Sequence, residues 1–126
     1  MLGSEKLVGF VATATPGKSR VFYEDTLGLQ LLEDSPFALV FRAGATTIRV
    51  QKVQGVVVSG YTALGWQVSD IARTVEELAA RGVAFQRYEG MDQDATGIWR
   101  TPDGSRVAWF RDPDGNTLSI TQMVAA

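Results

Sequence analysis

The chain repeats one pattern of strands and helix, and the second copy begins about 55 residues after the first. In the first half, an apolar strand over residues 7–13 precedes a helix over 18–27, with Thr15 or Ser19 as its N-terminal cap. Turn residues then separate three further expected strands, over 29–33, 37–42 and 46–53. A repeat of this length limits the fold to two copies of one β-α-β-β-β module.

The second half follows the same plan after a short linker at 54–60. A strand over 63–68 leads into an amphipathic helix over 71–81, which Asp70 caps and Gly82 ends. The strands expected after this helix cover 83–88, 98–101, 106–111 and 117–121. We therefore expect an α+β fold in a single domain, residues 1–126, with repeat 1 at about 7–53 and repeat 2 at about 61–123.

Composition narrows the chemistry that the chain can perform. It contains no histidine and no cysteine, so thiol chemistry, a thiolate zinc site and the usual imidazole base are excluded. A formal charge of −2 argues against a nucleic-acid partner, and no apolar run is long enough to cross a membrane. Because the start also lacks the features of a secretory signal, we expect a cytoplasmic location.

The segment from Phe110 to Gln122 reads FRDPDGNTLSITQ and predicts a tight hairpin. Pro113 presets φ, Gly115 supplies a positive φ, and the side chains of Asp114 and Asn116 can bond to nearby backbone. The strand that leaves the turn alternates polar and apolar residues. One of its faces is therefore expected to pack and the other to look toward a wetter space.

Three segments together resemble the glyoxalase, bleomycin-resistance and extradiol-dioxygenase superfamily, also called the vicinal oxygen chelate proteins. They are FYEDTLGLQLL, WQVSDIARTVEELAARGVAF and FRDPDGNTLSITQ. The resemblance runs from about residue 7 to 122. It implies two βαβββ modules that form a curved mixed sheet around a cleft, usually in a homodimer, but it does not fix the reaction.

Metal enzymes of this family are expected to hold a divalent cation with His and Glu at four cleft-facing strand positions. Carried over one at a time, these positions hold Val8, Arg49, Ala63 and Ser119 in this chain. None is an anionic or imidazole donor, and a guanidinium repels a cation. We therefore expect no metal and no cofactor at this site. A carboxylate-only site from Glu89, Asp92 and Asp94 is the alternative.

Strand alternation predicts which side chains line a cleft. The candidates combine apolar surface, amides and one fixed positive charge, as small-molecule pockets do. They are Phe10, Phe41, Arg49, Gln51, Gln67, Trp99, Trp109, Ser119 and Thr121. Arg49 is suited to clamp a carboxylate or phosphate, or else forms an ion pair within the chain or with a neighbouring subunit. Trp66 falls on the opposite face and is expected in the core, and core or dimer packing is the alternative for the other tryptophans and for Phe41.

These observations favour a metal-free, dimeric, small-molecule-binding protein that resembles the bleomycin-resistance type, since sequestration of a ligand needs only a pocket. One alternative is a lyase or isomerase of the same superfamily, with Glu89 or Asp94 as general base or with an atypical metal site. The other alternative is a non-catalytic interaction domain whose cleft is filled by side chains. The sequence alone leaves all three open.

Overall fold

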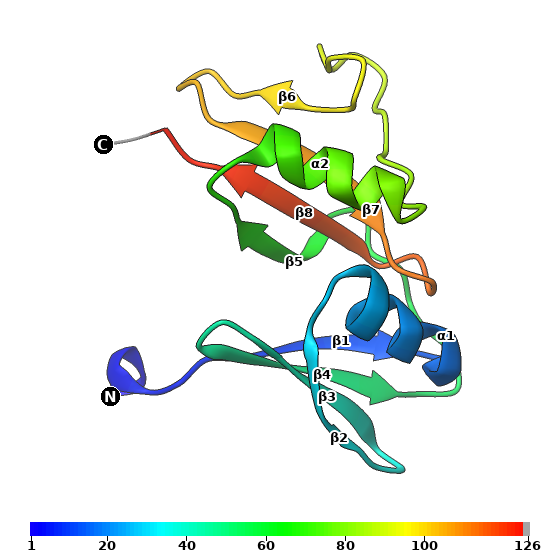
Figure 1. Cartoon of the computed structure of the whole chain (residues 1–126). Helices are drawn as coiled ribbons and strands as arrows, with labels where there is room; N and C mark the ends of the chain where they lie inside the picture. The colour runs from blue at the N-terminus through cyan, green and yellow to red at the C-terminus, as the bar shows by residue number, and fades with distance from the viewer. Residues whose placement is uncertain (125–126) are drawn as a thin grey trace. The chain divides into compact units, whose positions relative to one another are not determined.

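Two four-stranded sheets, each with one main helix, make up the structure, a computed structural model that describes residues 1–124 (Figure 1). The chain divides into two units, Met1–Val58 and Ser59–Ala126, which correspond to the two expected repeats. Each unit has the order β-α-β-β-β, so the predicted α+β fold of two such modules is confirmed. That the two modules form a single domain stays a prediction.

The first unit begins with a short 3₁₀ helix, η1 (Leu2–Ser4), ahead of the sheet. Its sheet has the order β1-β4-β3-β2, and only the β1–β4 pair is parallel. The elements are β1 (Val8–Thr13), α1 (Pro16–Val21), η2 (Phe22–Thr26), β2 (Gln30–Asp34), β3 (Ala38–Ala43) and β4 (Thr46–Lys52). One face of the sheet packs on α1 and η2 through fully buried residues that include Tyr23, Phe41 and Val50.

The helix of the first unit begins after Thr15, its N-cap residue, as predicted, but it differs from the prediction in its winding. The side chain of Thr15 makes no capping hydrogen bond. Instead, the Thr13 hydroxyl accepts the Thr15 N–H at 3.0 Å and lies 2.7 Å from the buried Ser19 hydroxyl. The second part of the predicted helix is η2, a turn of π-helix, which places the ring of Tyr23 in the core.

The second unit repeats the arrangement with the order β5-β8-β7-β6, and its parallel pair is β5–β8. Its elements are β5 (Thr62–Gln67), α2 (Ile71–Ala80), β6 (Trp99–Arg100), β7 (Arg106–Arg111) and β8 (Thr117–Gln122). Asp70 caps α2 as predicted, since its carboxylate accepts the Arg73 N–H at 3.1 Å, and Gly82 follows the helix with φ of 92°. No helix in residues 1–124 is long and apolar enough to cross a membrane.

The strand predicted over 83–88 is wrong. This segment runs beside β7 with a single backbone hydrogen bond to it, from the Gln86 N–H to the Trp109 oxygen at 2.8 Å. Other backbone groups of the segment are bonded to a side chain, that of Gln93, which replaces part of the expected ladder. The segment therefore follows the sheet edge without becoming a strand.

The hairpin between β7 and β8 depends on one buried carboxylate, that of Asp112, which is 6% exposed. It accepts the N–H groups of Asp114 at 3.0 Å and Asn116 at 2.9 Å, and the Asn116 side-chain amide at 2.8 Å. Gly115 has the expected positive φ of 87°. Asp112, which the sequence did not single out, is thus the main acceptor of the turn.

Replacing Asp112 with Ala should destabilise the protein by about 2 kcal/mol, because two half-buried backbone N–H groups and one side-chain amide lose their acceptor. Urea unfolding followed by circular dichroism measures this change. The control is Asp25→Ala, an exposed site where a change within about 0.5 kcal/mol is expected. Equal stability of the two variants would show that the turn does not need this carboxylate.

Candidate functional site

In the second unit, one face of the sheet packs on α2 and the other carries the candidate site. Ala108, Phe110, Leu118 and Ile120 face α2 together with its buried residues. Trp66 pairs with Ile120 and so lies on the α2 side, as expected, but it is half-buried and not part of the buried core. Since side chains alternate along a strand, the residues between these positions project from the opposite face.

Two rows of paired residues cross that opposite face. The first row is Gly65, Ser119 and Trp109. The second row is Gln67, Thr121, Val107 and Trp99. Residues paired across strands place their side chains side by side on the same face. Five of the predicted ligand-binding residues are thereby brought together: Gln67, Trp99, Trp109, Ser119 and Thr121.

Three half-buried rings, those of Tyr88, Trp99 and Trp109, form what we call the aromatic wall. The Trp99 and Trp109 ring centroids are 6.1 Å apart with planes tilted by 34°, and Tyr88 meets Trp109 edge-on at 5.5 Å. Tyr88 was not among the predicted ligand-binding residues. Its contact with Trp109 depends on the irregular path of residues 83–98.

The floor beside the wall is made of small residues. Gly65 has no side chain, and a Cβ built there would lie 2.7 Å from the Ser119 hydroxyl oxygen. The Ser119 hydroxyl thus occupies the space over Gly65. Two small residues next to two indoles leave the faces of the rings less covered than larger side chains would.

Some polar side chains of this face have no hydrogen-bond partner within the described part of the chain. Among residues 1–124, the side chains of Gln67 and Thr121 and the two indole N–H groups of the wall have no hydrogen-bond partner. Aromatic surface with a few unpaired donors and acceptors is typical of a small-molecule site. The arrangement can stack a flat ring system and orient it through hydrogen bonds.

The first unit carries a second set of candidates on its sheet face opposite α1. Phe10 pairs with Arg49, which pairs with Val40, and Ala12 pairs with Gln51. Phe10 is 52% exposed, and the side chain of Arg49 forms no hydrogen bond or ion pair with any described residue of its own unit. An ion pair within the first unit is therefore not the role of Arg49.

Phe41 requires a correction. It pairs with Ile48, so it faces α1, and it is 0% exposed and packs on Tyr23 with centroids 5.6 Å apart. A fully buried core ring is not available to a ligand on the open face. Val40 pairs with Arg49 on the neighbouring strand, so the next residue, Phe41, projects from the face opposite to that of Arg49.

The candidate bases lie in the loop that precedes β6. Glu89 is exposed. Burial raises the pKa of Asp94, but hydrogen bonds from the Thr96 hydroxyl and from backbone N–H groups outweigh it and lower the pKa below its usual value. The Asp94 carboxylate accepts the N–H groups of Thr96 at 2.9 Å and Ile98 at 3.0 Å, which gives it a turn-stabilising role.

The residues at the family's metal positions do not fit a divalent cation. The side chains of Val8 and Ala63 have no donor atom, Arg49 is a cation, and Ser119 has only a hydroxyl. Across residues 1–124, no three His, Cys, Asp or Glu residues are grouped closely enough to hold a metal, and this includes the acidic loop of Glu89, Asp92 and Asp94.

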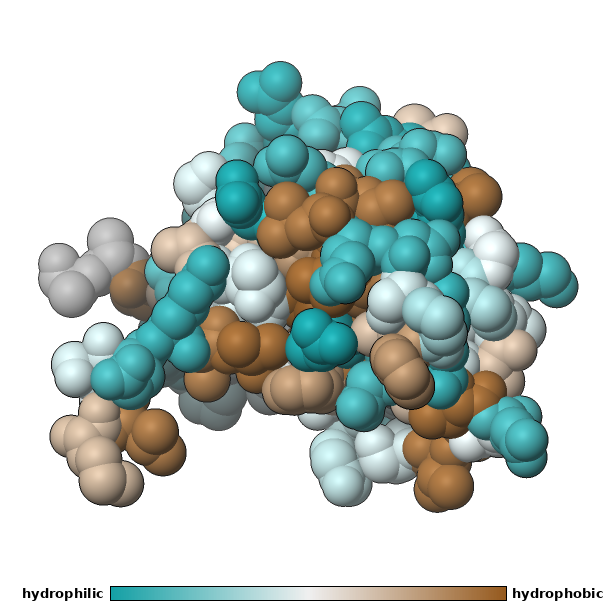
Figure 2. Space-filling model, turned by 90° about the horizontal axis from the view of Figure 1, so that it is seen from below, coloured by the Kyte–Doolittle hydropathy of each residue, from teal (hydrophilic) through white to brown (hydrophobic). Residues whose placement is uncertain are grey.

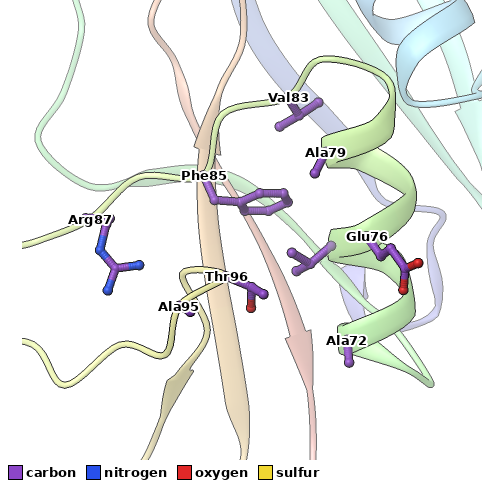
Figure 3. A pocket seen from close by; sticks show the side chains of 9 residues that line it. Ala72, Glu76, Ala79, Val83, Phe85, Arg87, Ala95 and Thr96 are labelled. Atoms are coloured by element: carbon purple, nitrogen blue, oxygen red, sulfur yellow. The ribbon is translucent and has the colours of Figure 1, made fainter.

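A separate hollow of about 660 Å³ lies in the second unit between α2 and residues 83–96 (Figure 3). Val75, Ala79, Val83 and Phe85 line it. Phe85 contacts Phe110, which faces α2, so this hollow is on the side of the sheet away from the aromatic wall. The Arg87 guanidinium at its rim is already bonded to the Gln93 and Asp94 carbonyl oxygens.

The chain belongs to the Glyoxalase/Bleomycin resistance protein/Dioxygenase superfamily, which it matches over residues 8–120. The uncharacterized protein YraH of Bacillus subtilis (strain 168) is 30% identical over 123 residues, covering 85% of this chain and 89% of that protein.

Two solved structures illustrate the range of proteins with this fold. TnmS3, an antibiotic binding protein from Streptomyces sp. CB03234, has a TM-score of 0.70 and 23% identity over 98% of this chain and 99% of its own. Lactoylglutathione lyase from Agrobacterium tumefaciens has a TM-score of 0.71 and 16% identity over 94% of this chain and 93% of its own. At these identities the similarity shows a shared fold, which hosts both a binding protein and an enzyme.

Replacing Gly65 with Ala should cost about 1 kcal/mol, because the new methyl group meets the Ser119 hydroxyl. In a Ser119→Ala background the same replacement should cost less, since the clashing oxygen is gone. A double-mutant cycle of urea unfolding measures this coupling. Additive effects of the two replacements would contradict the close approach of these residues.

Proposed function

We propose that this chain is a metal-independent small-molecule-binding protein that holds a flat, ring-containing ligand against the aromatic wall. The observation that carries the proposal is the wall itself: two tilted indoles and a tyrosine beside a floor of Gly65 and Ser119. Stacking on an aromatic ring adds about 1 kcal/mol beyond burial. The unpaired groups of Gln67 and Thr121 would orient the ligand.

Independence from metal is part of the proposal. It is supported by the donor set, since the four positions that would carry ligands offer one hydroxyl and one cation between them. Binding by stacking and hydrogen bonds needs no Lewis acid. Equimolar sequestration of a ligand would need only the chain's own residues, and TnmS3, which shares the fold, is an antibiotic binding protein.

The enzymatic alternative has weaker support. A lyase or isomerase would need a base, and the lowered pKa of Asp94 makes this carboxylate a poorer proton acceptor near neutral pH. Glu89 is the remaining candidate for the general base of a lyase or isomerase. No described contact places it against the aromatic wall.

We propose that the chain acts as a homodimer in the cytoplasm. Support for the dimer comes from β1, an edge strand of its sheet with Val8 38% and Phe10 52% exposed. Figure 2 shows that apolar side chains, in brown, reach the surface between polar ones. Covering exposed apolar side chains is a common reason for subunit association.

Binding can be tested with two three-ring probes of opposite charge, proflavine and anthracene-2-carboxylate, by isothermal titration calorimetry in EDTA. At least one probe should bind wild-type protein. Trp109→Ala should lower the affinity about five- to ten-fold, which corresponds to about 1 to 1.4 kcal/mol of lost stacking. Trp109→Phe should lose less, because it retains a ring.

Phe85→Leu is the matched control for the location of the site, because Phe85 lines the hollow on the α2 side of the sheet. Its affinity should stay within two-fold of wild type. Loss of binding in Phe85→Leu but not in Trp109→Ala would place the ligand in that hollow and contradict the proposal. Binding that disappears in EDTA would contradict the independence from metal.

A further inference from the structure

We infer that Gln93 is a positioning residue for the aromatic wall. Its side chain bonds to the backbone near the three rings and holds them in place without contacting the rings themselves. The inference deepens the proposed function and rests on it where ligand binding is concerned. Its structural part concerns how Tyr88, Trp99 and Trp109 are kept together, and this part stands by itself.

The side-chain amide of Gln93 is fully used by three backbone groups. Its oxygen accepts the Tyr88 N–H at 2.7 Å. Its nitrogen donates to the Gln86 oxygen and to the Gly97 oxygen, each at 2.9 Å. Since a primary amide has two N–H donors, both are engaged, and one side chain joins the two arms of the loop over 86–97.

Each ring of the aromatic wall is connected to Gln93 by a short path. The backbone N–H of Tyr88 donates directly to the side-chain oxygen of Gln93. Trp99 forms a β-bridge with the backbone of Gln93. Trp109 is reached through Gln86, whose N–H donates to the Trp109 oxygen and whose own oxygen accepts from Gln93.

The need for such a residue follows from the path of residues 83–98. This segment forms no regular strand in the structure, so its backbone groups lack the ladder that would otherwise satisfy them. A half-buried amide that takes over three of these bonds fixes the distance between the segment and β6. That distance affects how Tyr88 meets Trp109, and it adds to the pairing of Trp99 with Val107 in setting how Trp99 lies against Trp109.

Neighbouring polar residues support the loop but contact the wall less directly. Arg87 donates to the carbonyl oxygens of Gln93 and Asp94, at 3.2 and 2.8 Å. Asp94 bonds within its own turn, to Thr96 and Ile98. Gln93 alone in this loop joins Tyr88 and Trp99, one by its side chain and the other by its backbone.

Gln93→Glu is the sharpest test, since it preserves size and the acceptor oxygen but removes both donors and sets a carboxylate against two carbonyl oxygens. The first readout is the near-ultraviolet circular dichroism of the coupled Trp99–Trp109 pair, assigned with Trp99→Phe. The second readout is the affinity for whichever of proflavine and anthracene-2-carboxylate binds wild type more tightly.

We expect Gln93→Glu to lose at least half of the circular dichroism intensity that comes from the coupled Trp99–Trp109 pair, which we call the couplet. The variant should also bind the probe about ten-fold more weakly. The matched control is Gln86→Ala, which removes a neighbouring side-chain amide that, among residues 1–124, bonds only to the Ala84 oxygen, at 3.4 Å. This control should keep the couplet and stay within two-fold in affinity. If Gln93→Glu does not fold, Gln93→Met, which is neutral and of similar length, decides the same comparison.

An unchanged couplet in a folded Gln93 variant would overturn the inference, whatever the affinity. If wild type binds neither probe, the proposed function fails, and the couplet still decides whether Gln93 positions the rings. Loss of the couplet together with unchanged affinity would show that Gln93 positions the rings but that the probe does not bind against them, which would contradict the proposed function.

Discussion

The alternation of side chains across each sheet is the constraint on which the rest of the structure depends. One face of each sheet is taken by its helix, so the apolar residues of that face pack and the remaining face is left to carry function. In the second unit this separation puts Phe110 and Leu118 under α2 and Trp109 and Ser119 on the open face. Slippage by one residue would exchange the two sets.

The shape of the face opposite α2 depends on the segment that lies along the edge of the sheet. Residues 83–98 do not continue the sheet, and their backbone is instead satisfied by the side chain of Gln93 and by the turn around Asp94. This irregular edge brings Tyr88 over Trp109, a contact that a regular edge strand would not guarantee. The site thus combines a regular floor, fixed by strand pairing, with a wall fixed by side-chain hydrogen bonds.

Most of the strands, and the faces of their residues, were predictable from the sequence because alternation and turn residues are local signals. They indicated both modules and the opposite faces of Trp66 and Ser119. Phe41 was misassigned although its alternation relative to Arg49 placed it in the core. The hydrogen bonds of Gln93 carry no recognisable sequence signal, since they depend on the irregular path of residues 86–97. The acceptor role of Asp112 has a local signal, because an Asp at the start of a turn often accepts the N–H two residues further on, as it does here from Asp114.

The most direct test of the account is the response of the three indole N–H signals in a ¹H–¹⁵N correlation spectrum when proflavine or anthracene-2-carboxylate is added in EDTA. The chain has three tryptophans, and Trp66 is an internal reference because it lies on the α2 side of the sheet. We predict that the signals of Trp99 and Trp109 shift while that of Trp66 stays in place. A shift of the Trp66 signal alone would contradict the proposed site, and a shift that appears only when a metal ion is added would contradict binding without metal.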